Sequence, residues 1–190
     1  MLLYLCVYFT LLSCNNTDST ALEEKYYNLE KIGWKSKIRK QNVGKLNYTA
    51  VDVPLQYYVL KDLGADNLSE VESIYEKNVT DRIIEFTYDL TSGGKVLDEQ
   101  NTGLNFDESY RYLAFNLEND FRVVTSQNDT IICSGVTYDR NYNIVPYERV
   151  LLFFSGVKPD EKIQLIYDDN LFRNGRIKFQ FNEPYTKILL

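Results

Sequence analysis

The sequence contains no histidine and only three cysteines. Histidine is the commonest general base and the commonest transition-metal ligand, so a histidine-based catalytic triad or zinc site is excluded within this chain. Cys6 and Cys14 lie near the amino terminus, which leaves Cys133 alone in the rest of the chain. No disulfide within the main domain is therefore expected. Because Cys133 follows the apolar pair Ile131-Ile132, we expect it to pack as a small hydrophobic side chain.

The sequence also lacks any apolar run of the ~20 residues that a membrane-spanning helix needs. The stretch from Leu2 to Leu12 has about the length of the hydrophobic part of a secretory signal peptide, and it carries no charge. It ends in Leu11-Leu12-Ser13-Cys14, and the polar tract 15–20 follows. This arrangement resembles the lipobox of bacterial lipoproteins, in which the cysteine becomes the lipidated first residue of the mature protein.

The resemblance implies an address in the bacterial cell envelope. Signal peptidase would cut before Cys14, its thiol would carry a diacylglycerol, and a further acyl chain such as palmitate would join the new amino group. Several acyl chains together hold a protein stably on a membrane that it does not span. Asn15, rather than Asp, follows the cysteine, which favours the outer membrane. The expected division is a signal peptide over 1–13, a lipidated polar tether over 14–21 and a single globular domain over 22–190.

The chain is acidic, with a formal net charge of −6. This balance argues against a nucleic-acid partner, which would require a basic patch. Basic residues do cluster between Lys35 and Lys45. They form either a solvated strand or loop, or a surface that rests on anionic lipid headgroups near the anchor. We expect no cofactor, because the sequence has no Gly-rich phosphate loop, nucleophile elbow or Cys-x-x-Cys pair.

The spacing of apolar residues predicts two or three short helices. They fall at 22–32, at about 68–77 with Asn67 or Ser69 as the cap, and from an Asp107 cap to about residue 119.

Alternation of apolar and polar residues predicts more strands than helices. The expected strands are 46–60, which Pro54 either limits to a sheet edge or breaks, 82–90, 121–125, 130–138, 149–154 at a sheet centre, 162–167 and 176–182. Residues 95–97 are expected to return beside 82–90, and Asn174-Gly175 to form a hairpin turn. The predicted class is α+β, mostly antiparallel β, as a sandwich or a strongly bent sheet.

The loop between two of these strands has the composition of a binding site. Its candidate residues are Tyr138, Asp139, Arg140, Tyr142 and Tyr147. Aromatic faces beside amides and charges suit sugar rings, and the same mixture suits a protein epitope. The alternative is a structural loop whose tyrosines cover the sheet edge.

Asp168-Asp169-Asn170 gathers oxygen ligands at a strand end, which makes Asp168 and Asp169 weak candidates for calcium. The spaced pattern of a dedicated calcium loop is missing, so a simple turn is the competing interpretation, and no metal is expected.

These observations favour a non-catalytic binding or structural role in an envelope assembly, with another envelope protein or a glycan as partner. The alternatives are a small envelope enzyme that uses paired carboxylates, and a carbohydrate-binding module.

Overall fold

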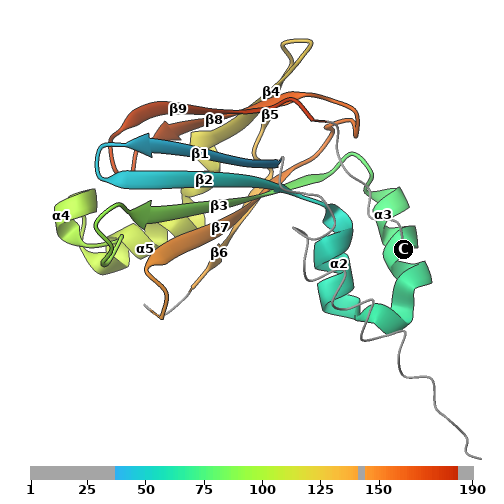
Figure 1. Cartoon of the computed structure of the whole chain (residues 1–190), viewed down its shortest axis with the longest axis horizontal. Helices are drawn as coiled ribbons and strands as arrows, with labels where there is room; N and C mark the ends of the chain where they lie inside the picture. The colour runs from blue at the N-terminus through green and yellow to red at the C-terminus, as the bar shows by residue number, and fades with distance from the viewer. Residues whose placement is uncertain (1–36, 141–143, 184–190) are drawn as a thin grey trace, which may run out of the picture.

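The computed structural model describes residues 37–140 and 144–183. The expected signal peptide, tether and first helix lie outside these residues, as does Tyr142. Two antiparallel sheets pack face to face, and helices flank them (Figure 1). The predicted class, α+β with mostly antiparallel sheet, is confirmed.

The larger sheet has the strand order β1-β2-β3-β7-β6, and the smaller has β5-β4-β8-β9. The strands of the larger sheet are β1 (Ile38–Val43), β2 (Leu46–Val53), β3 (Arg82–Leu90), β7 (Tyr147–Phe154) and β6 (Gly135–Asp139). Those of the smaller sheet are β5 (Thr130–Ile132), β4 (Phe121–Thr125), β8 (Ile163–Asp169) and β9 (Gly175–Phe181). The central position expected for 149–154 is confirmed, because β7 lies between β3 and β6.

The described residues contain four α-helices and two 3₁₀ turns. They are α2 (Leu55–Leu63), η2 (Ala65–Asn67), α3 (Leu68–Lys77), α4 (Glu99–Thr102), α5 (Phe106–Phe115) and η3 (Leu117–Asp120). Among these residues, no helix has both the length and the apolar character that a membrane crossing requires.

One strand prediction and one helix prediction need correction. The extended segment expected to reach residue 60 ends at Val53, and Pro54 is the N-cap residue of α2. α5 is capped by Asn105 rather than Asp107, because Asn105 and Glu108 exchange side-chain and backbone hydrogen bonds in a capping box.

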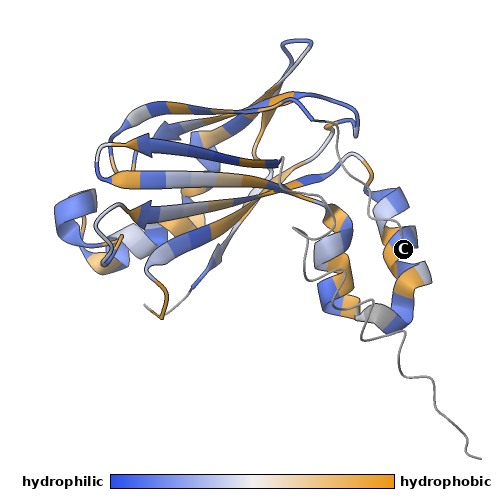
Figure 2. Ribbon diagram, in the orientation of Figure 1, coloured by the Kyte–Doolittle hydropathy of each residue, from blue (hydrophilic) through white to orange (hydrophobic). Residues whose placement is uncertain are grey.

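Apolar and polar residues alternate along several strands (Figure 2). The buried members of this pattern form the core, so each sheet has one apolar face turned toward the other sheet. The core is rich in aromatic rings: Tyr48, Phe86, Tyr88, Phe121, Tyr167 and Phe179. Phe121 and Tyr167 stack with centroids 4.4 Å apart. Two buried tyrosine hydroxyls donate to Asp169, Tyr48 at 2.7 Å and Tyr167 at 2.8 Å, which satisfies groups that burial would otherwise penalise.

The strand expected over 130–138 is divided between the two sheets. β5 pairs with β4 in the smaller sheet, and β6 pairs with β7 in the larger one. Cys133 and Ser134 form the corner, where their amides donate to Phe121 O and Phe153 O. Cys133 is 7 % exposed, as expected for a core residue.

Side chains of β1 join the two sheets along one side of the sandwich. Arg39 donates through Nε to Gln180 O at 2.6 Å, and Gln41 donates through Nε2 to Lys178 O. Arg39 also forms an ion pair with Glu183. These bonds occupy carbonyls of β9 at the edge of the smaller sheet and so protect that edge.

Part of the basic stretch is buried, contrary to the solvated or lipid-facing surface expected. Lys37 is 2 % exposed, and its Nζ lies 3.9 Å from the Asp52 carboxylate. The Arg82 guanidinium lies 3.5 Å from the same Asp52 oxygen and donates to the carbonyls of Lys158, Pro159 and Glu161. The three ionic side chains therefore join β2, β3 and the residue before β1 to the turn before β8.

Two turn predictions have different outcomes. Residues 95–97 do not return as a strand, because the neighbours of β3 are β2 and β7. The β8–β9 hairpin at Asn174-Gly175 is confirmed, but Asp169 pairs with Gly175, so residues 170–174 form the loop. Gly175 takes a positive φ of 77°, which favours glycine there.

Candidate functional site

The outer face of the five-stranded sheet presents a row of side chains beneath α2. The register places Val51, Glu85, Leu151 and Thr137 side by side across β2, β3, β7 and β6. Their chain neighbours point into the core, so this row must point outward. α2 lies over one end of this face, where its side chains meet those of β3 and β7.

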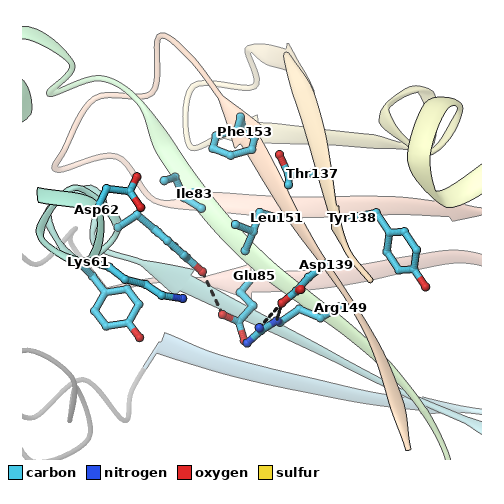
Figure 3. A pocket seen from close by; sticks show the side chains of 12 residues that line it. Lys61, Asp62, Ile83, Glu85, Thr137, Tyr138, Asp139, Arg149, Leu151 and Phe153 are labelled. Atoms are coloured by element: carbon cyan, nitrogen blue, oxygen red, sulfur yellow. Dashed lines mark hydrogen bonds and ion pairs between the residues drawn. The ribbon is translucent and has the colours of Figure 1, made fainter. Parts of the chain in front are cut away.

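A pocket of about 450 Å³ lies between α2 and the sheet. Its floor is apolar and consists of Ile83, Leu151 and Phe153 (Figure 3). Tyr57 and Tyr58 of α2 form one wall, with their rings edge to face and 5.2 Å between centroids. Volume and lining are both typical of small-ligand sites, which combine an apolar surface with a few placed polar groups.

Polar side chains on the sheet side of the pocket form one connected network. The Tyr58 hydroxyl donates to Glu85 Oε2 at 3.0 Å, and Arg149 Nη1 lies 3.7 Å from Glu85 Oε1. Arg149 also donates through Nε to Asp139 Oδ2 at 3.0 Å (Figure 3). Arg149 therefore links the carboxylates of β3 and β6.

Burial and the neighbouring carboxylates shift the pKa values of Tyr58 and Arg149. Burial and the adjacent Glu85 charge raise the pKa of Tyr58 far above its ordinary value of 10.0, so Tyr58 remains a hydrogen-bond donor. Burial alone would lower the pKa of Arg149, but the bond to Asp139 and the charge of Glu85 outweigh it and raise that pKa. Tyr58 and Arg149 therefore keep their protons around neutral pH and act as fixed donors in the pocket.

The tyrosine-rich loop predicted as a site is divided between two environments. Asp139 lines the pocket, and Tyr147 lines a neighbouring hollow on the same sheet face. Tyr138 borders the pocket, but its hydroxyl donates to the buried Glu148 at 2.5 Å. Arg140 lies over the ring of Tyr110 in α5, 4.7 Å from its centroid. The predicted binding residues therefore do not all line one pocket.

The two carboxylates considered as calcium ligands accept hydrogen bonds from other protein groups. Asp168 accepts from Arg122 and Arg176, each at 2.6 Å. Asp169 is buried and accepts two tyrosine hydroxyls and the Phe172 amide. Their positions give both residues roles in holding the β8–β9 end of the sandwich. Across residues 37–140 and 144–183, no group of three acidic or cysteine side chains is arranged to hold a metal ion.

Sequence reasoning missed the residues at the centre of the pocket, Tyr58, Glu85 and Arg149. A partial signal existed, because the alternation in β3 and β7 identifies Glu85 and Arg149 as outward-facing. Their convergence depends on α2 crossing the sheet, and the segment that forms α2 was expected to be extended.

Comparison with known proteins provides no family for this chain. No protein-family model matches it, and no curated protein matches it. A crystal structure described as a novel protein of unknown function from Burkholderia pseudomallei K96243 aligns over 85 % of this chain and 86 % of its own. Its TM-score is 0.40 and its sequence identity 9 %, so neither fold nor function is transferred from it.

Proposed function

We propose that this chain is a cell-envelope lipoprotein, anchored by lipid on Cys14 at the outer membrane, whose domain binds a partner without catalysing a reaction. The proposal for the anchor is supported by the apolar leader, the lipobox-like Leu11-Leu12-Ser13-Cys14 and the polar tract after it. The proposal for binding is supported by the pocket beneath α2, whose partner is another envelope protein or a glycan.

The proposal of a non-catalytic role rests on the ion pairs and hydrogen bonds that the pocket's charged groups make with one another. Glu85 and Asp139 both pair with Arg149, and Glu85 also accepts from Tyr58. General acid–base catalysis by two carboxylates requires environments that separate their pKa values, so that one donates while the other accepts. A shared arginine instead gives both carboxylates the same cationic partner and holds them in fixed positions, which suits recognition.

Site-specific photocrosslinking in intact cells tests this function. Benzoylphenylalanine is introduced at Thr137, an exposed residue of the pocket, and in a matched control at Lys178, an exposed residue on the outer face of the smaller sheet. The proposal predicts a discrete adduct from position 137 and none from position 178. Equal adduct patterns from both positions, or no adduct from position 137, would contradict it.

A carboxylate-dependent envelope enzyme is the second candidate, because Glu85 and Asp139 line the same pocket. Incubation of purified cell-envelope glycans with the full chain separates the two functions. An enzyme would release soluble fragments, and Glu85→Gln would abolish that release. The binding function predicts no release by either protein.

A further inference from the structure

A second hollow lies beside the pocket beneath α2, along the same two strands. This hollow has a volume of about 280 Å³ and shares Glu85 with the pocket. It is further lined by Thr87 and Asp89 of β3 and by Pro146 and Tyr147 at the start of β7. From Ile83 to Asp89 the floor extends over seven residues, and the six steps between them span about 20 Å at a rise of ~3.3 Å per residue. Such a groove, defined here as the pocket plus this hollow, has the length for a chain-like ligand.

The groove has mixed charge, with more carboxylates than cations, which disfavours an anionic ligand. Lys61 and Arg149 supply positive charge, while the carboxylates are Asp62, Glu85, Asp89 and Asp139. Asp89 accepts from the Asn47 amide at 2.7 Å, and Glu85 and Asp139 are paired with Arg149. An anionic chain would meet carboxylates along its whole length, and a cationic chain would meet Arg149 at the centre.

An uncharged ligand rich in hydroxyl groups fits this arrangement. A carboxylate that already accepts one hydrogen bond still has free lone pairs, and a ligand hydroxyl can donate to one of them. A ligand hydroxyl can also accept from a protein hydroxyl such as that of Thr87. It can therefore join the existing network without breaking the ion pairs of Arg149, whose loss would leave partly buried charges without partners.

The apolar parts of the groove suit the flat faces of sugar rings. Leu151 and Phe153 form the floor at one end, beside the tyrosine pair of α2. Tyr147 and Pro146 lie at the other end. Aromatic and apolar surface at both ends, with hydrogen-bonding groups between them, matches a row of pyranose rings that each have an apolar face and a polar rim.

We infer that the groove binds a linear, uncharged oligosaccharide, which lies along β3 and β7 from Tyr58 to Tyr147. The inference rests on the proposed binding function and names its ligand class. Tyr58, Leu151 and Phe153 hold one sugar unit in the pocket, and Tyr147 holds a unit further along the chain.

Calorimetric titration of the full chain tests the inference. The chain is kept in a detergent without a sugar headgroup, and the probes are the hexasaccharides and disaccharides of the cello-, chito-, malto-, xylo- and laminari- series. We expect at least one hexasaccharide to bind, and to bind at least tenfold more tightly than its disaccharide. Tyr147→Ala should weaken the hexasaccharide at least tenfold and leave the disaccharide unchanged, whereas Tyr147→Phe, which keeps the ring, should bind like the parent. Lys178→Ala is the matched surface control and should bind as the parent does.

Three results would overturn the inference. They are equal affinity for a hexasaccharide and its disaccharide, equal effects of Tyr147→Ala on both, and no binding of any hexasaccharide. If no hexasaccharide binds but a protein adduct still forms at position 137, the proposed function stands and the ligand class is wrong. If neither occurs, both are wrong.

Discussion

The Tyr58 hydroxyl donates to the Glu85 carboxylate at 3.0 Å, and this bond connects α2 to the outer face of β3. Glu85 points outward because its neighbours Ile84 and Phe86 fill the core. The bond fixes α2 over the sheet and at the same time orients Glu85 toward Arg149. One contact therefore both closes the pocket and arranges its polar side.

A double-mutant cycle between these residues should show direct coupling. We expect Tyr58→Phe, Glu85→Leu and the double variant to give a coupling energy of about 1 kcal/mol in urea unfolding, the net worth of a typical hydrogen bond. The control pairs Tyr58→Phe with Gln164→Ala, which lies in the other sheet. If both cycles give the same coupling energy, the bond does not hold α2 to the sheet.

Arg82 should contribute more to stability than any exposed arginine. Arg82→Met leaves the buried Asp52 without its guanidinium partner and also removes bonds to three carbonyls before β8. We expect a loss of about 3–5 kcal/mol in the free energy of unfolding. Arg176→Met breaks the exposed pair with Asp168 and should cost far less, because solvent screens that pair. Similar losses in the two variants would contradict the role assigned to the buried cluster.

Two carboxylates should give pH dependences of opposite sign. Burial raises the pKa of Asp120 above 3.8, although bonds from Tyr112 and Asn170 oppose the shift. Its stabilisation is therefore complete below pH 3.8 and is lost as the pH rises through the raised value. The unfolding free energy of the parent minus that of Asp120→Asn should fall as the pH rises.

Asp168 supplies the matched comparison. Hydrogen bonds from Arg176 and Arg122 lower its pKa below 3.8, so its stabilisation is present above that pH and is lost as the pH falls through the lowered value. The difference between the parent and Asp168→Asn should therefore grow as the pH rises from acid. Denaturant titrations between pH 3 and pH 8 measure both, and slopes of the same sign would show that the two environments are misassigned.

The thiol of Cys133 should be inert in the folded protein. It is nearly buried, and burial raises its pKa, so little thiolate forms near neutral pH. In a Cys6→Ser/Cys14→Ser chain, we expect a disulfide reagent such as DTNB to label one thiol in denaturant and essentially none under native conditions. Rapid native labelling would place Cys133 outside the core.

Local pattern was sufficient where a segment forms one element in one environment. The period-two alternation of β3 predicted its bounds, and the helical spacing after Asn67 predicted α3. Local sequence pattern failed to predict features that depend on tertiary packing. Between Thr130 and Asp139 only Ser134-Gly135 marks the corner at which the chain changes sheets, and both flanking halves favour extended backbone, so the segment was predicted as one strand. Tyr58, Glu85 and Arg149 are far apart in sequence, so their meeting depends on strand order and on the position of α2.

Metabolic labelling with a radioactive or clickable palmitate analogue tests the central claim of an anchored envelope protein most directly. The chain is expressed with its leader, beside Cys14→Ser and Cys133→Ser variants. The account predicts that the parent and Cys133→Ser incorporate label and sediment with outer membranes, whereas Cys14→Ser does neither. Label and membrane sedimentation that persist in Cys14→Ser would contradict it.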